Sequence, residues 1–243
     1  RGNAVPLLLG VAMLLAFVAG FFVVRPSKFV DAPVYSSGMY GKNFFDAAYN
    51  RLPSSRGYEG SISSALVAHH LLVADKIAEV FDGIADDDVR TVVIVSPNHF
   101  RRGIASAQVS EGSWETPYGV VYADVDAVEQ LLVASPLLHH DETAYSDEHG
   151  IYGLTPFVAR SFPQAKIVPI ILREDVSADD AWALGETIAR TLSDAVLIAS
   201  VDMTHYHDAD YTAANDAKVM ALIGEGGMVD GGMANEESLD IDS

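Results

Sequence analysis

Hydrophobic and polar positions along the chain alternate between two patterns. Continuous apolar runs rich in β-branched residues predict buried strands, because central parallel strands are covered on both faces. These runs occupy residues 64–67, 91–95, 120–123, 166–172 and 196–200. Apolar residues at helical spacing predict helices, and these occupy residues 71–81, 125–134, 154–162, 177–193 and 211–223. The alternation predicts an α/β domain with a mainly parallel or mixed central sheet flanked by helices.

Two segments depart from this regular alternation. Residues 25–60 mix Pro, Ser, Gly and Tyr without a clear period, which predicts a linker followed by an irregular segment. Pro169 interrupts the run 166–172. Because proline has no N–H for a strand ladder, it predicts an edge strand or a bulge there.

The start of the chain carries a long uncharged apolar run. Residues 4–24 contain no charged side chain, and about 20 apolar residues span a bilayer core. We therefore expect one N-terminal transmembrane helix over 4–24, a linker over 25–32 and an α/β domain over 33–243. A cleaved signal peptide and a buried core helix are the alternatives.

These expectations make the protein membrane-anchored with a single pass. One basic residue precedes the run, and Arg25 and Lys28 follow it, so the positive charges leave the side of the membrane undecided. The chain starts without methionine and stops at Ser243 soon after a Gly-rich stretch. An α/β domain can continue there with another strand and helix, so we expect a C-terminally truncated domain.

Charge and cysteine content narrow the function classes. The chain has 15 basic and 34 acidic residues, a formal net charge of −19, and no cysteine. Nucleic-acid binding needs clustered Lys and Arg, so this balance argues against it. Disulfides, thiolate zinc sites and cysteine nucleophiles are excluded.

Histidines follow the ends of the predicted strands. His69 comes directly after residues 64–67, and His99 follows the run 91–95. Asp202 and His205 come after the run 196–200. Ligands of open α/β sheets bind outside the carboxyl ends of the strands, so these side chains are expected to share one edge.

This set of residue types is typical of a metal site. Neutral imidazole binds iron, copper and zinc, and two histidines with a carboxylate form the site of many non-haem iron enzymes. A histidine outside the coordination shell can act as acid or base near neutral pH; His149, in a loop leading into a helix, is available for this. The alternative is that each histidine is a hydrogen-bonded loop residue. His139, His140 and His207 are expected to be peripheral, with the first two in a polar loop.

Six motifs together resemble one protein family. They are LVAHHLLVAD, VIVSPNHFRRG, WETPYGVV, DEHGIYGLTPFV, IVPIIL and ASVDMTHYH. In this order they resemble the Memo family, whose bacterial and archaeal members are called AmmeMemoRadiSam system protein B. The similarity runs from about residue 33 to the chain end. The family is similar in fold to class III extradiol ring-cleavage dioxygenases, which use non-haem Fe(II).

The resemblance implies roles for five residues. His69 and His99 fall on the first two metal ligands, and Thr204 falls on the third metal position. His149 falls on the acid/base histidine of the dioxygenases, and Asp147 on a neighbouring acid of the pocket.

The sequence departs from the family pattern at the third metal position. Animal Memo proteins have cysteine there and the dioxygenases have glutamate, whereas threonine is a poor ligand for a divalent metal. Asp202, His205 or water is therefore expected to complete the shell. Ala68 also stands where a proline usually precedes the first histidine.

Three functions remain open. The first is a metal-dependent, dioxygenase-like oxidoreductase with Fe(II), or with Cu or Zn. The second is a metal- or peptide-binding module that kept the fold without catalysis, and the third is a scaffold at the membrane surface. The name of the family's system implies radical-SAM and AMMECR-type partner proteins, and the apolar run implies contact with a membrane.

Overall fold

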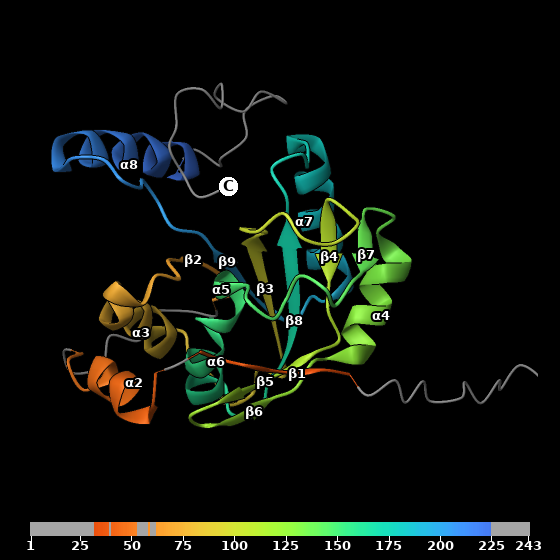
Figure 1. Ribbon diagram of the computed structural model, residues 1–243, viewed down its shortest axis with the longest axis horizontal. Helices are drawn as coiled ribbons and strands as arrows, with labels where there is room; N and C mark the ends of the chain where they lie inside the picture. Colours follow the sequence, from red (N-terminus) through yellow and green to blue (C-terminus); the bar gives the residue numbers. More distant parts are fainter. Residues whose placement is uncertain (1–31, 39, 53–57, 59–61, 225–243) are drawn as a thin grey trace, which may run out of the picture. The chain divides into compact units, whose positions relative to one another are not determined.

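The chain divides into two compact units, Arg1–Ala32 and Pro33–Ser243. The computed structural model describes residues 32–38, 40–52, 58 and 62–224, and the account below concerns the second unit. Its central sheet has the strand order β2-β9-β3-β8-β4-β7 (Figure 1). The strands are β2 (Ser64–Val67), β3 (Thr91–Pro97), β4 (Ala107–Val109), β7 (Leu138–His140), β8 (Lys166–Leu172) and β9 (Val196–Ser200).

This sheet is mixed. The strands β2, β9, β3 and β8 run parallel to their neighbours, and β4 pairs antiparallel with β8 and parallel with β7. The parallel strands read as continuous apolar runs because helices cover both of their faces. The fold is therefore mixed α/β, with a central sheet flanked by helices.

Side chains of β3 alternate between two hydrophobic clusters, one on each face of the sheet. Val92 and Ile94 belong to one cluster and Val93 to the other, as the period of two in a strand requires. The first cluster is covered by α2 (Lys42–Tyr49), α3 (Ala74–Gly83), α5 (His149–Tyr152) and α6 (Thr155–Ser161). The second is covered by α4 (Val125–Ala134) and α7 (Ala178–Thr191).

Aromatic rings fill the first cluster. The Phe157 ring of α6 lies 5.3 Å from the Phe45 ring and 5.6 Å from the Phe81 ring, measured between centroids. Such pairs add about 0.5–1.5 kcal/mol to the burial of the rings themselves. They tie α2, α3 and α6 together on the face that also carries α5.

The helix starts follow the sequence signals. The Ser177 hydroxyl accepts the backbone N–H of Asp180 at the start of α7, and the Asp124 carboxylate accepts that of Ala127 at the start of α4. Each satisfies a donor that the first helical turn leaves without a partner in the helix. The helix predicted over 71–81 begins as the 3-10 turn η1 (Leu71–Val73) before α3, and α8 (Ala209–Gly224) follows β9.

A second, three-stranded sheet takes one strand from the region predicted as irregular and another from the run predicted as a strand over 120–123. Its order is β1-β5-β6, with β1 (Val34–Ser36), β5 (Ser113–Thr116) and β6 (Gly119–Val121). The WETPYG segment forms the turn between β5 and β6, closed by a hydrogen bond from the Thr116 hydroxyl to the Gly119 carbonyl. The prediction of irregular structure over residues 25–60 was wrong where β1 and α2 form.

Two local predictions are corrected. Pro169 lies in β8, which is an inner strand between β3 and β4, so it marks neither an edge strand nor a bulge. The antiparallel ladder with β4 stops at Ile170. The next residue, Pro169, accepts the backbone N–H of Ser110 at 3.3 Å but has no N–H to return to that strand. His139 and His140 lie in β7 and not in a loop.

The predicted transmembrane helix and single-pass membrane localisation are also corrected. No helix among the described residues is long and apolar enough to cross a membrane. The run over residues 4–24 lies outside the described residues, as does nearly all of the predicted linker over 25–32. For the described residues, the fold class is the mixed sheet with flanking helices.

Candidate metal centre

The carboxyl ends of three adjacent parallel strands form the candidate site. In the order β2-β9-β3, the chain leaves the sheet into His69, Asp202 and His99 respectively. The ladders pair Val67 with Ser200 and Val95 with Ala199, so the three strands end at nearly the same level. Their register explains why residues far apart in sequence meet at one edge.

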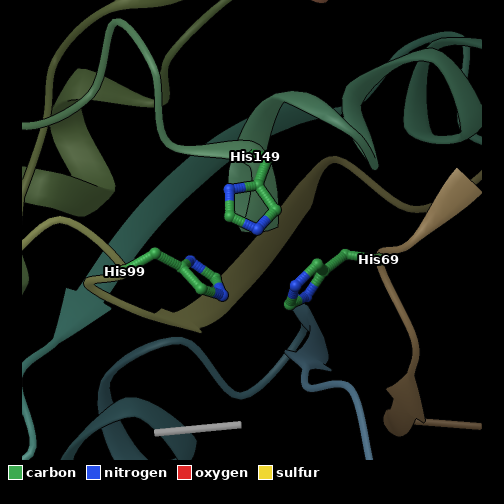
Figure 2. A group of neighbouring side chains, drawn as sticks. All are labelled: His69, His99 and His149. Carbon is green, nitrogen blue, oxygen red and sulfur yellow. The ribbon is translucent and has the colours of Figure 1, made fainter. Parts of the chain in front are cut away.

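Three histidines meet at this edge (Figure 2). One ring nitrogen each of His69, His99 and His149 lies within 4.8 Å of the other two. Ligands bonded at about 2.0–2.1 Å to one ion lie at most about 4.2 Å apart, so small ring movements complete a site. The cluster can hold a divalent metal.

The His69 ring is held by Ser200 at the end of β9. The Ser200 hydroxyl donates to the carbonyl of Gly150 at 2.6 Å, which uses its single proton. At 3.1 Å from the Nδ1 atom of His69, the same hydroxyl therefore accepts a hydrogen bond from that nitrogen. In the neutral ring this leaves Nε2 with the lone pair that a metal requires.

The His99 ring is held by Glu148, the residue that caps α5. One carboxylate oxygen of Glu148 accepts the Nδ1–H of His99 at 2.5 Å, and the other accepts the backbone N–H of His99 at 3.0 Å. The Nε2 atom is again the nitrogen that carries the lone pair in the neutral ring. Two of the three histidines thus contact buried partners through Nδ1, as metal-ligating histidines commonly do.

His149 is the first residue of α5 and the most open member of the cluster. Its side chain is 37% exposed, and its ring centroid lies 3.9 Å from that of His99 and 5.1 Å from that of His69. The Phe100 ring lies 6.0 Å from it and the Tyr152 ring 6.5 Å. Burial raises the pKa of the Tyr152 hydroxyl, so this residue stays protonated beside the cluster.

Asp202 and His205 lie beside His69. Asp202 accepts the backbone N–H of His69 at 2.9 Å, and its second oxygen lies 3.5 Å from His69 Nε2 and 3.6 Å from His205 Nε2. Among the described residues, the metal-sized group itself contains the three histidines. Asp202 and His205 are thus neighbours of that group on its His69 side.

Thr204 and Asp147 lie in other surroundings. The Thr204 hydroxyl donates to the Asp216 carboxylate at 2.6 Å and accepts from the Asn215 amide at 2.8 Å. The Asp147 side chain is 52% exposed and pairs with Arg102. A hydrogen bond from Arg102 lowers the pKa of Asp147, which therefore serves as a charged surface partner of that arginine.

Sequence reasoning missed two residues of the site, Glu148 and Ser200. In the DEH motif the choice fell on Asp147, although Glu148 is the fully buried carboxylate. Little in the sequence signalled it, because α5 was not predicted and glutamate is not among the usual N-cap residues. Ser200 lies with Val196 and Ile198 on the buried side of β9. A polar residue at such a position indicates that its side chain has a specific hydrogen-bond partner.

The order Ser200, His69, Asp202 superficially matches a hydrolase triad. Ser200, however, is 0% exposed, and its proton is directed to the Gly150 carbonyl. A nucleophile must reach its substrate and give its proton to the histidine. Neither condition is met, so the serine orients His69.

Comparisons with known proteins show what the chain is similar to. The family model for Memo-like protein matches residues 53–230. A MEMO1 family protein of Methanothermobacter thermautotrophicus is 33% identical over 170 residues, which cover 69% of this chain and 57% of that protein. One of Caldivirga maquilingensis is 34% identical over 55% of this chain and 49% of its own length, and one of Thermotoga maritima is 36% identical over 54% and 48%. The chain spans about half the length of the curated relatives it matches.

Proposed function

This chain belongs to the Memo-like protein family, and from this premise we propose that it is a metal-dependent, dioxygenase-like oxidoreductase of the non-haem iron type. The observation that carries the proposal is the meeting of one nitrogen from each of three histidines within 4.8 Å. Imidazole ligands suit Fe(II), Cu and Zn alike. Fe(II) is proposed because of the resemblance to extradiol dioxygenases.

The ligand set is proposed as His69, His99 and His149. The buried partners Ser200 and Glu148 support the first two, since they fix the Nδ1–H tautomers. The short distance of His149 from both rings supports it as a third ligand, in place of the acid/base role that the resemblance implied. The hydrogen bonds of Thr204 to α8 argue for leaving it out.

Proton transfer is proposed for Asp202 and His205. Their side chains lie next to each other and next to His69, with the carboxylate between the two rings. A histidine beside a carboxylate is a common arrangement for general acid–base catalysis. The open side of His149, flanked by Phe100 and Tyr152, is the proposed entry for a small organic ligand.

Extradiol cleavage fits these parts without a further co-reactant. The reaction breaks one ring carbon–carbon bond of a catechol and adds both atoms of dioxygen to the product, so no external reductant is consumed. An iron(II) ion held by His69, His99 and His149 would supply the electron exchange with dioxygen and substrate. The residues of the protein hold the histidine rings in place, orient the bound catechol and transfer protons.

A non-catalytic metal-binding module is the second candidate. One observation favours it: the group of three histidines contains no carboxylate, whereas the iron site of many oxygenases combines two histidines with one carboxylate. The radical-SAM and AMMECR-type partners implied by the family's system name stay a prediction for either candidate.

Metal analysis combined with oxygen consumption tests the proposal. The full chain is stripped with a chelator, loaded anaerobically with Fe(II) or Zn(II), desalted and analysed for bound metal. We expect one metal per chain, and oxygen uptake with catechol-type substrates from the iron form and not from the zinc form. A chain that retains neither metal contradicts the metal site, and a loaded iron form without oxygen uptake favours the non-catalytic module.

A further inference from the structure

We propose that Glu148 is a positioning residue that holds His99 in its Nδ1–H tautomer and directs Nε2 into the histidine cluster. The expected consequence of this positioning is tighter metal binding, and that consequence rests on the proposed function. The tautomer itself is a property of the protein with or without metal. It therefore has a test of its own.

The contacts of Glu148 use both carboxylate oxygens. One oxygen accepts the Nδ1–H of His99 and the backbone N–H of Gly150, and the other accepts the backbone N–H of His99. Three N–H donors thus face a side chain that is 0% exposed. The two carboxylate oxygens serve as acceptors for all three donors.

The same carboxylate acts on two histidines of the cluster. It accepts the Gly150 N–H as the cap of α5, whose first residue is His149, and it lies 3.9 Å from His149 Nδ1. The orientation of His99 and the start of the helix that carries His149 therefore depend on one buried group. Loss of this group affects both rings at once.

Charge adds to this geometric effect. Three neutral imidazoles bring no negative charge to a divalent cation. The nearest carboxylates therefore contribute to the affinity of the cluster for that cation. Glu148 is hydrogen-bonded to one ligand ring, and Asp202 lies beside another. Carboxylates that hydrogen-bond to metal-ligating histidines typically contribute about 10- to 100-fold to metal affinity.

The neighbouring residue Asp147 provides a matched control. It has the same charge one position earlier, but its side chain is 52% exposed and pairs with Arg102. We expect Glu148→Gln to weaken zinc binding by about 10- to 100-fold in competition titrations, and Asp147→Asn to leave it within about twofold of the parent chain. Equal affinities of Glu148→Gln and the parent chain would overturn the inference.

Histidine nitrogen chemical shifts test the tautomer directly in the parent chain. In metal-free and zinc-loaded protein alike, we expect His99 to carry its proton on Nδ1, assigned by its loss in His99→Ala. A proton on Nε2 would overturn the inference, even if Glu148→Gln fails to fold. A parent chain that binds no zinc but shows the Nδ1–H tautomer would contradict the proposed function while supporting the positioning role.

Discussion

Replacing His99 with alanine is expected to weaken zinc binding by more than about 100-fold. Loss of a partner outside the coordination shell already weakens metal binding by about 10- to 100-fold. His99 supplies one of the three ring nitrogens of the described cluster, so its loss is expected to weaken binding further. The variant also leaves the Glu148 carboxylate without its ring partner. Competition titration of the metal-free full chain with zinc measures the change.

His140→Ala is the control for this variant. His140 is a histidine of β7 with an exposed side chain, and its ring pairs with Glu142. This variant tests whether the loss of a histidine outside the cluster also weakens zinc binding. We expect affinity like that of the parent chain. A His99→Ala protein that binds zinc as tightly as His140→Ala would place the metal elsewhere.

Replacing Gly150 with alanine is expected to damage both the fold and the site. A Cβ atom at this position would overlap the Ser96 hydroxyl and lie 3.0 Å from Ser96 Cβ and 3.2 Å from His99 Cε1. Ser96 is buried in β3, so the strain falls partly on the His99 ring. Overpacking of this kind costs about 1–3 kcal/mol. Because it displaces a proposed ligand, we expect zinc affinity to fall by about 100-fold, the upper end of the effect of an outer partner.

Gly185→Ala separates this steric effect from a general effect of alanine. Gly185 lies within α7, and a Cβ atom there would meet no other atom within 4 Å. Alanine is favoured over glycine in a helix by about 1 kcal/mol, so we expect a more stable protein with unchanged zinc affinity. Thermal and denaturant unfolding measure stability. A Gly150→Ala chain as stable and as tight for zinc as its parent would mean that the site tolerates the methyl group.

The apolar pattern predicted most of the central sheet because its strands are buried on both faces. The run 166–172 and the run 196–200 coincide with β8 and β9. The pattern did not predict α2, although Phe45 from this helix is fully buried. Its eight residues are too few to show a helical period against the irregular sequence on either side. Pro169 was misread because its position relative to the β4 ladder depends on register, which the sequence alone does not give.

The strand ends predicted that His69 and His99 share one edge, but not that His149 joins them instead of His205, nor how the rings are held. His69 and His99 follow parallel strands that both pair with β9, so the topology of an α/β sheet already brings them to one edge. The choice between Asp147 and Glu148 depends on which side chain points inward at the start of α5, and neighbouring residues of a helix point in different directions. The hydrogen bonds of Thr204 to α8 likewise depend on tertiary placement.

Anomalous diffraction from crystals of the full chain soaked with zinc tests the central claim most directly. The account predicts one strong peak bonded at about 2.0–2.1 Å to one nitrogen each of His69, His99 and His149, with the Nδ1 atoms of His69 and His99 still facing Ser200 and Glu148. A chain whose zinc peak lies away from these three rings, or that shows no peak there, would contradict it.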